Sequence, residues 1–249
     1  MGKLVVLIPC YNEEKSIAQV IKKVPVGKIR KLGLEPAIMV VNNNSSDATR
    51  KVAEAAGATV IDEPRKGKGN AMRRGFASLP ADTTYVVMLD GDDTYNPSEI
   101  TRLIEPLESG FCKVVIGSRL SGRMTPGAMT IVSRLGNWFF THLVRKTHNV
   151  AVTDVLTGYF AWTREAIDDL SPHLRSSGFA IEMEMITKMA RMNYEIFSVP
   201  ISYTPRVGES NLRPIHDGWR IFKMYAKTLR WRPQVHLPER PLKDRQSEY

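Results

Sequence analysis

Cysteine is scarce in this sequence, and long apolar runs are absent from it. The 249 residues include only two cysteines, Cys10 and Cys112, and their spacing fits neither a disulfide framework nor a zinc site. Both are expected to be small core residues of a cytosolic protein. No stretch reaches the roughly 20 consecutive apolar residues that a membrane-spanning helix needs. The sequence therefore predicts a globular fold held by an ordinary apolar core, without disulfides or a spanning helix.

Negative charge is also under-represented. The 35 lysines and arginines exceed the 26 aspartates and glutamates, which gives a formal net charge of +9. Such a balance favours phosphate-bearing substrates, an anionic membrane face or nucleic acid, although a basic surface can also serve solubility alone. No DNA- or RNA-binding motif is present in the sequence. Nucleic acid is therefore not expected as a partner.

The first half of the chain alternates between short apolar runs and amphipathic segments. The apolar runs predict strands at 3–8, 37–41, 59–61, 85–89 and 114–116. The segments between them predict helices at 13–23, 48–56, 67–77 and 97–107. Alternation in units of about 30 residues is typical of a mostly parallel sheet with helices on both faces. The expected fold class is α/β, a Rossmann-like three-layer αβα sandwich.

The pattern changes in the second half. Residues 129–144 predict an amphipathic helix that carries Trp138 and Phe139 between basic residues, and 219–232 repeat this aromatic and basic pattern. Such C-terminal helices can lie in a membrane interface. Core packing, or a face between two copies in a homodimer, would produce the same pattern. Residues 233–249 are charged and rich in proline, and are expected to form a polar tail.

Carboxylates mark the end of the fourth predicted strand and a segment of the second half. Asp90 and Asp92 are two residues apart after a buried strand, so both can face one divalent ion, and their oxygens suit Mg²⁺ or Mn²⁺. The alternative is a plain Asp-rich turn, which the preceding strand disfavours. Glu182 and Glu184 would point to different faces of a helix. At most one of these two glutamates is therefore expected to face a substrate.

Polar side chains also follow the first and second predicted strands, at the edge where ligands of such sheets bind. Tyr11 can pack on a base, and Asn12 and Glu13 can hydrogen-bond a base or a ribose. Glu13 can equally be a first-turn charge of the following helix. Asn42 offers both a donor and an acceptor to a base edge. Asp47 is better explained as a helix N-cap.

Basic residues supply candidate phosphate contacts. The Gly-rich loop around Lys68 and Gly69 opens a helix, so its backbone N–H groups can approach a diphosphate, although an ordinary basic surface turn would look the same. Arg119 and Arg206 can bind phosphate through their forked guanidinium groups. Ser210 follows Arg206 closely in the sequence.

These motifs, in this order, resemble the family 2 glycosyltransferases of GT-A fold over roughly residues 3–232. Within that family the chain looks most like the polyprenyl-phosphate (dolichyl-phosphate) hexose synthases. The matching runs are 8–13, 42–47, 67–69, 89–92, 115–119, 154–158, 178–184 and 200–210.

The resemblance implies roles for the residues that match it. The donor site, which includes the nucleoside pocket, would be formed by Pro9, Tyr11, Asn12, Glu13, Asn42, Lys68, Gly69, Asp90, Arg119 and Ser210. Asp90 and Asp92 would hold Mg²⁺ or Mn²⁺. The catalytic residues would be Asp92, Glu184 and Arg206, with Glu184 near the metal or the sugar. The helix at 129–144 would be an interface helix that admits a lipid.

Two departures from the family pattern concern the donor. The second-strand loop usually has two aspartates where this chain has Asn42 and Asn43, and the run 208–211 usually ends in lysine where this chain has Asn211. The loop after Gly67 looks more like that of the glucose-type enzymes than of the mannose synthases. A UDP-sugar is therefore favoured over GDP-mannose.

The implied activity is that of an inverting, metal-dependent glycosyltransferase. It would move a hexose from UDP-glucose or UDP-N-acetylglucosamine to dolichyl or polyprenyl phosphate. A GDP-mannose-dependent dolichyl-phosphate mannose synthase and a family 2 enzyme with a soluble acceptor are the alternatives. A nucleotidyltransferase would need a Gly-rich, basic loop directly after the first strand, where this chain has Cys10 to Glu13.

The expected organisation is one GT-A catalytic domain at 1–232. Its nucleotide-sugar half would end near residue 120, and its acceptor half would occupy about 121–232. The expected location is the cytoplasm, with peripheral attachment to the cytoplasmic face of the membrane. Homodimer formation through the aromatic helices stays open as an alternative to that attachment.

Overall fold

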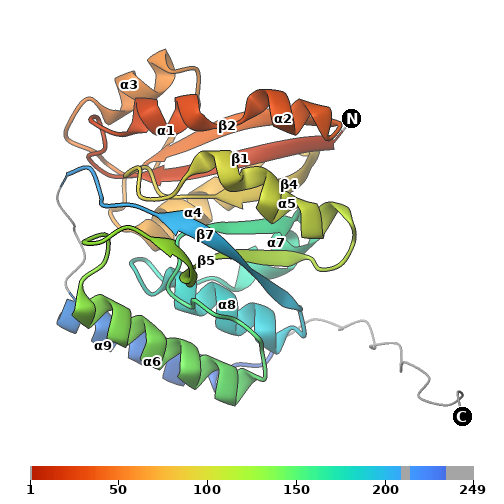
Figure 1. The fold of residues 1–249 in the computed structure, drawn as a ribbon, viewed down its shortest axis with the longest axis vertical. Helices are drawn as coiled ribbons and strands as arrows, with labels where there is room; N and C mark the ends of the chain where they lie inside the picture. The colour runs from red at the N-terminus through yellow and green to blue at the C-terminus, as the bar shows by residue number, and fades with distance from the viewer. Residues whose placement is uncertain (1, 209–213, 234–249) are drawn as a thin grey trace, which may run out of the picture.

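The computed structural model describes residues 2–208 and 214–233 of the chain. A seven-stranded sheet forms its centre, in the order β3-β2-β1-β4-β6-β5-β7 (Figure 1). The strands are β1 Gly2–Cys10, β2 Leu34–Asn42, β3 Thr59–Asp62, β4 Thr83–Met88, β5 Val114–Met124, β6 Phe160–Thr163 and β7 Ile196–Tyr203. All neighbouring pairs are parallel except those made by β6, which runs antiparallel to β4 and to β5. The predicted α/β class with a mostly parallel sheet is confirmed.

Helices cover both faces of the sheet. The α-helices are α1 Ile17–Lys23, α2 Val26–Lys31, α3 Thr49–Ala55, α4 Lys68–Ala77, α5 Ile100–Glu108, α6 Ile131–His148, α7 Arg164–Leu170, α8 Ile181–Arg191 and α9 Pro214–Thr228. Two short 3₁₀ helices are η1 Pro97–Glu99 and η2 Ser171–His173. Among the described residues, no helix has both the length and the apolar character needed to cross a membrane.

The sheet has an apolar core on each face, and alternate side chains of a strand belong to different cores. Along β1, Leu4, Val6 and Ile8 pack with the apolar faces of α1, α2, α3 and α5. Val5 and Leu7 point to the opposite face, where α4, α7 and α8 form the second core together with α6 and α9. Successive strand side chains point to opposite sides, so one apolar strand supplies both cores.

The predicted elements agree with the structure along the first half, with shifted ends. The helix predicted from residue 13 begins at Ile17, because Glu13 to Ser16 form a turn in which the Glu13 carbonyl accepts from the Ser16 and Ile17 N–H groups. The helix predicted at 129–144 extends to His148 and ends at Asn149, which has a left-handed φ of 51°. Asparagine adopts that conformation more readily than most residues.

Candidate active site

A pocket of about 480 Å³ lies at the carboxyl ends of β1 and β4. These two strands are parallel neighbours, so the loops that follow them meet at one edge of the sheet. The pocket is lined by seven of the residues expected to form the site: Pro9, Tyr11, Glu13, Lys68, Asp90, Asp92 and Arg206. Ser210, also expected there, lies outside the described residues.

One side of the pocket floor is an ion-pair group around Arg206. Its Nη1 donates to Asp92 Oδ2 at 2.9 Å, and its Nη2 donates to a carboxylate oxygen of Glu13. The other oxygen of Asp92 accepts from Thr94 Oγ1 at 2.6 Å. Arg206 follows β7 at the far edge of the sheet. It therefore ties the end of the second half to the loops after β1 and β4.

The other side of the floor is centred on Lys68 in the first turn of α4. Its Nζ donates to Asp90 Oδ1 and to Glu182 Oε1, both at 2.6 Å. Only 12% of the Lys68 side chain and 7% of the Glu182 side chain are exposed. Burial alone would lower the pKa of Lys68, but the charges of Asp90 and Glu182 outweigh that effect and raise it. Lys68 is therefore a firmly protonated cation at the pocket wall.

This floor holds more carboxyl groups than cations. Four carboxylates, those of Glu13, Asp90, Asp92 and Glu182, face the two cations of Lys68 and Arg206. Burial raises the pKa of Glu13 to about 7, although Arg206 opposes the shift. Burial, together with the charge of Asp90, also raises the pKa of Asp92.

When all four are ionised, these carboxylates exceed the two cations by two charges, which one divalent cation would balance, and oxygen donors suit Mg²⁺ or Mn²⁺. Without such an ion, Glu13 is only partly ionised at neutral pH, because its pKa is about 7. Within the described ranges no group of three or more acidic, histidine or cysteine side chains surrounds a common point that could hold a metal ion. Mg²⁺ is commonly bound by one or two carboxylates together with substrate phosphates. Asp90 and Asp92 fit such a shared site, in which a bound diphosphate supplies the remaining oxygens.

Helix α8 separates the two glutamates that its sequence placed two residues apart. Glu182 reaches the pocket wall through Lys68. Glu184 points elsewhere: its Oε2 accepts from the Ser176 N–H at 2.7 Å and its Oε1 from Lys188 Nζ at 2.6 Å. The expectation of Glu184 near the metal or the sugar is therefore wrong in this structure. Glu182 is instead the glutamate of α8 that turns toward Lys68 at the pocket wall, because a two-residue step along a helix rotates the side chain to another face.

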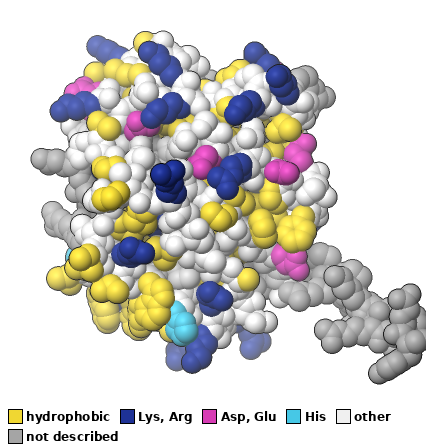
Figure 2. Space-filling model, viewed as in Figure 1, with side chains coloured by type: hydrophobic (Ala, Val, Ile, Leu, Met, Phe, Trp, Pro, Cys, Tyr) yellow, Lys and Arg dark blue, Asp and Glu magenta, His cyan; other side chains and the backbone are white. Residues whose placement is uncertain are grey.

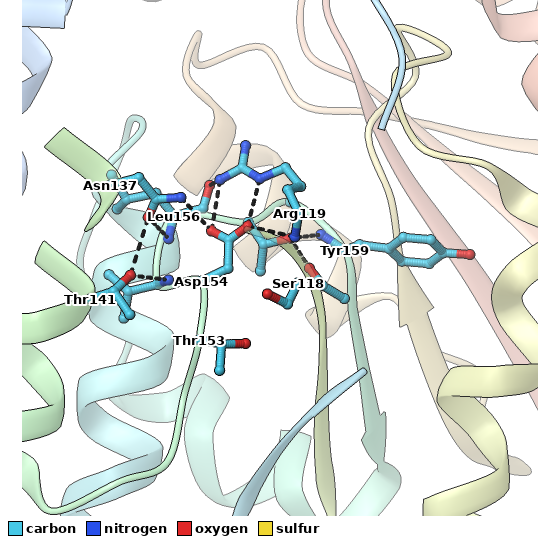
Figure 3. Close-up of polar contacts among 12 residues, drawn as sticks. Ser118, Arg119, Asn137, Thr141, Thr153, Asp154, Leu156 and Tyr159 are labelled. Atoms are coloured by element: carbon cyan, nitrogen blue, oxygen red, sulfur yellow. Dashed lines mark hydrogen bonds and ion pairs between the residues drawn. The ribbon is translucent and has the colours of Figure 1, made fainter. Parts of the chain in front are cut away.

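Arg119 was expected to hold phosphate, but its guanidinium is occupied within the protein (Figure 3). Its Nε donates to Asp154 Oδ2 at 2.8 Å and its Nη2 to Asp154 Oδ1 at 2.9 Å, and Nη2 also donates to the Leu156 carbonyl. Asn137 of α6 donates to the same Asp154 carboxylate and contacts Thr141. Arg119 is buried and is absent from the pocket lining. The network instead fastens α6 to β5 and to the segment before β6.

The asparagines after β1 and β2 hold the loops rather than face the pocket. Asn42 Nδ2 donates to Asp62 Oδ1 at 2.9 Å, and Asn12 Oδ1 accepts from the Ser46 N–H at 2.8 Å. Neither side chain lines the pocket, whereas Asn43 does. The Asn42 side chain is therefore not placed for the expected base contact, and Asn12 is a link between two loops. The Asn43 side chain also holds the loops, since its Nδ2 donates to the Glu63 and Arg65 carbonyls and its Oδ1 accepts from the Gly67 N–H.

Close backbone packing explains the glycines at the start of α4. A Cβ on Gly69 would lie 2.2 Å from the Ser176 carbonyl oxygen, and one on Gly67 would lie 2.2 Å from that of Ser177. Gly67 also has a φ of +122°, which L side chains avoid. Gly69 itself does not line the pocket. Its expected role at the diphosphate is replaced by a packing role that brings Lys68 and the Ser176 segment together.

Several lining residues were given no individual role from the sequence. Gly178 and Phe179 lie just before α8, and His216, Asp217 and Arg220 lie on the first turns of α9. In the sequence, the aromatic residues of 219–232 predicted only the apolar side of α9. The i, i+4 spacing of His216 and Arg220, which places them on one helix face, is the signal that could have identified its pocket side.

Comparisons with known proteins show the family to which the chain belongs. The family described as "Glycosyl transferase family 2" matches residues 5–170. Glycosyltransferase AglJ of Haloferax volcanii is 39% identical over 219 residues, which cover 87% of this chain and 69% of that protein. A dolichyl-phosphate hexose transferase of the same organism is 31% identical over 90% of this chain and 92% of its own length.

Solved structures share the fold. Glucosyl-3-phosphoglycerate synthase from Mycobacterium tuberculosis, in complex with Mn²⁺ and UDP-glucose, superposes with a TM-score of 0.71 at 22% identity, covering 92% of this chain and 79% of that chain. At this identity the likeness shows the GT-A fold alone. Because the family model matches residues 5–170, which is more than half of the chain, the chain belongs to glycosyltransferase family 2.

Proposed function

We propose that the chain is an inverting polyprenyl-phosphate hexosyltransferase that uses Mg²⁺ or Mn²⁺. The donor is a nucleotide-sugar, with UDP-glucose or UDP-N-acetylglucosamine favoured, and the acceptor is dolichyl or polyprenyl phosphate. The observation that carries the proposal is the pocket floor, where four carboxylates face only Lys68 and Arg206 among the described cations of that floor. Such a floor suits a divalent ion with a diphosphate.

The donor would lie along this floor. A volume of about 480 Å³ is within the range of roughly 300–1,000 Å³ that is usual for small-molecule sites. Tyr11 lines the pocket and would contact the nucleoside. Asp90 and Asp92 would hold the divalent ion, which supplies charge neutralisation for the leaving diphosphate. Arg206 would add a second positive group on the same side.

An acceptor phosphate changes what the protein must do. The second pKa of a phosphate monoester is near 6, so the group is largely ionised at pH 7. It therefore needs no strong general base, and the protein's task is positioning and charge neutralisation. Attack from the side opposite the leaving diphosphate inverts the anomeric carbon. For a hydroxyl acceptor, Glu182 would be the candidate base instead.

A cation for the acceptor phosphate is available on α9. Arg119 is held by Asp154, so it is not free to take the role that the sequence suggested. Arg206 and Arg220 are the arginines that line the pocket in the described part of the chain. Arg206 pairs with both Glu13 and Asp92, whereas the single ion pair of Arg220 among the described residues is a long contact of 3.9 Å with Asp217, and its side chain is 62% exposed. We therefore assign the acceptor phosphate to Arg220.

The outer side of α6 and α9 supports a lipid acceptor and peripheral membrane contact. Hydrophobic side chains gather over α6 in Figure 2. The exposed apolar residues of the two helices are Ile131, Val132, Leu135, Trp138, Phe139, Ile215, Trp219 and Phe222. Ile131 is 77% exposed and Trp138 is 61% exposed. With Arg134, Arg145 and Lys146 beside them, these side chains suit an interface of anionic lipids. A face between two copies is the competing explanation.

The decisive test is a transfer assay with separate acceptors. Purified protein is incubated with each radiolabelled UDP-hexose or GDP-mannose, with Mn²⁺ or Mg²⁺, and with polyprenyl phosphate or 3-phosphoglycerate. We expect label in the organic phase with a UDP-sugar and the lipid acceptor, and loss of that product with EDTA. Product with GDP-mannose would select the mannose-synthase alternative. Label that stays only in the aqueous product would overturn the lipid assignment.

Membrane contact is tested by sedimentation with vesicles. Wild-type protein should pellet with vesicles that contain phosphatidylserine, whereas a Leu135→Glu/Trp138→Glu variant should stay in the supernatant. The matched control is Phe111→Glu, which changes an exposed aromatic residue far from α6 in sequence and outside this surface. Equal pelleting of wild type and the double variant would overturn the membrane surface. A loss of dimer in the double variant would favour the homodimer face.

A further inference from the structure

Lys68 is shared between a metal-site carboxylate and a carboxylate outside that site. Its Nζ lies 2.6 Å from Asp90 Oδ1 and 2.6 Å from Glu182 Oε1. The three groups come from α4, the loop after β4 and α8, so they are brought together only by the tertiary fold. Lys68 also lines the pocket.

The space around this group is limited. The Gly158 backbone packs against it, because a Cβ at Gly158 would lie 2.4 Å from Asp90 Oδ2 and 3.1 Å from Lys68 Nζ. An ammonium and a divalent ion on the same carboxylate would also repel each other. Lys68 and a divalent ion are therefore competitors for Asp90.

Glu182 gives Lys68 a second anchor. The Glu182 side chain is buried, and within the part of the chain that the structure describes its recorded ion pair is with Lys68. When Lys68 leaves Asp90 it keeps this partner, so its charge stays at the pocket wall. A lysine held there meets the diphosphate that a metal-bound donor carries, and an ammonium is a suitable phosphate ligand.

We infer that Lys68 is a positioning residue that exchanges partners: it pairs with Asp90 before the divalent ion binds, and with Glu182 and the donor diphosphate afterwards. This exchange makes the ion and the donor bind better together than the ion binds alone. The inference rests on the proposed function only in assuming a divalent ion at Asp90 and a nucleoside diphosphate beside it. It does not depend on the acceptor.

Two substitutions should move the affinity for Mn²⁺ alone in opposite directions. Lys68→Met removes the competitor, so Mn²⁺ without nucleotide should bind about tenfold more tightly. With saturating Mn²⁺, the same variant should bind UDP about tenfold more weakly, because the diphosphate loses a cation. Glu182→Gln leaves Lys68 with Asp90 as its charged partner, so Mn²⁺ alone should bind several-fold more weakly. Mn²⁺ binding is measured by electron paramagnetic resonance and UDP binding by calorimetry.

The matched control is Lys66→Met, which changes another lysine of the pocket lining, two residues before Lys68 and ahead of α4. Lys66 donates to the Tyr11 hydroxyl and has no carboxylate partner among the ion pairs of the described residues. Its removal should leave the affinity for Mn²⁺ alone within about twofold. Thermal unfolding of each variant checks that it is folded, and Glu182→Gln provides the test if Lys68→Met does not fold.

The outcomes separate this inference from the proposed function. If wild-type protein binds no Mn²⁺, the metal part of the proposed function fails. If wild-type protein binds Mn²⁺ but Lys68→Met binds it equally or more weakly, the exchange of partners is overturned. A structural role alone would weaken both ligands in Lys68→Met. Tighter Mn²⁺ together with weaker UDP supports the exchange, whatever acceptor the enzyme uses.

Discussion

Two clusters of buried ion pairs in this chain use the same residue types but differ in their balance of charge. One cluster, called the closed network here, is formed by Asp154, Arg119 and Asn137. Each carboxylate oxygen of Asp154 accepts two hydrogen bonds from the other two residues. In the pocket, four carboxylates share Lys68 and Arg206. The first cluster is complete in itself, whereas in the second the carboxylates outnumber the cations by two. Unbalanced charge beside a cavity, rather than the presence of charged residues, is what identifies a ligand site here.

The largest expected effect lies in the closed network. Every partner of Asp154 is a donor, so Asp154→Asn places an amide N–H₂ against other donors and leaves Arg119 without its counter-charge. Breaking a buried pair in this way costs about 3–5 kcal/mol. Urea unfolding should show that loss in the free energy of unfolding.

The control for Asp154→Asn is the same change at an exposed pair. Asp168 pairs with Arg164 and is 57% exposed, so Asp168→Asn should change the free energy of unfolding by less than about 1 kcal/mol. If Asp154→Asn stays as stable as wild type but loses donor binding, the network belongs to the site and the comparison between the two clusters fails.

The pocket cluster should respond in the opposite way, through activity. Asp92→Asn removes a metal carboxylate from the floor, and transfer should fall about 10²–10³-fold, or roughly 2.7–4 kcal/mol of transition-state stabilisation. Its free energy of unfolding should change little, because burial already disfavours the ionised form of Asp92, as its raised pKa indicates. The radiolabel assay and urea unfolding measure the two effects.

The neighbouring residue provides the control for that substitution. Asp93 pairs with Lys23, does not line the pocket, and has a left-handed φ of 61°. Asparagine tolerates that conformation, so Asp93→Asn should keep the activity within a few-fold of wild type. Full activity in Asp92→Asn with metal present would remove the metal assignment.

The sequence predicted the first half of the fold well because its signals are local. Apolar runs followed by amphipathic segments identify β1 to β5 and the helices α1, α3, α4 and α5, and no long-range information is needed for that. The short helix α2 between β1 and β2 was not predicted. The strand β6 was not predicted: it has four residues and pairs antiparallel with β4 and β5, so its existence depends on neighbours far away in the chain. The strand β7 at the sheet edge was missed for a similar reason.

The site was predicted where motifs sit at strand ends and not where partners are distant. Asp90 and Asp92 end a buried strand, and the fold carries them to the pocket. The partner of Arg119 is Asp154, 35 residues later, and no local sequence pattern predicts that ion pair. The spacing alone predicted that the side chains of Glu182 and Glu184 point to different faces of a helix. It could not say which one turns toward α4, because that depends on how α8 packs.

The free energy of unfolding should depend on pH through Glu13 in the pocket cluster. The pKa of Glu13 is about 7 in the folded chain against an ordinary 4.5, so between these values the folded protein holds a proton that the unfolded chain releases. The stability that this proton contributes is present below pH 4.5 and is lost as the pH rises through 7. Linkage gives a loss of about 2 kcal/mol in the free energy of unfolding between pH 5 and pH 7.

Glu13→Gln should remove that slope, while Glu14→Gln should keep it. Glu14 is the exposed neighbour of Glu13, which makes the two variants a matched pair. Urea unfolding at pH 5, 6 and 7 measures the slope for each of them. Identical slopes in wild type and Glu13→Gln would mean that the pocket carboxylates are already balanced in the folded protein, which would contradict the contrast between the clusters.

The smallest expected effects come from removing one hydroxyl in each cluster. Thr94→Val deletes the donor that lies 2.6 Å from Asp92 Oδ1 and keeps the shape of the side chain. Loss of a group that orients a metal ligand typically costs at least about tenfold in affinity, or about 1.4 kcal/mol. Mn²⁺ binding in the presence of UDP should weaken by that factor, with the free energy of unfolding nearly unchanged.

Thr141→Val is the corresponding change in the closed network. The Thr141 hydroxyl accepts from the Val155 N–H at 3.1 Å and contacts Asn137 Oδ1 at 3.4 Å, so valine leaves a buried donor without its partner. The expected cost is about 1 kcal/mol in the free energy of unfolding, with Mn²⁺ and UDP affinities at wild-type values. If Thr141→Val weakened ligand binding as much as Thr94→Val does, the network around Arg119 would be coupled to the pocket. The two clusters would then be one functional unit, reached through the Gly158 backbone that packs against Asp90.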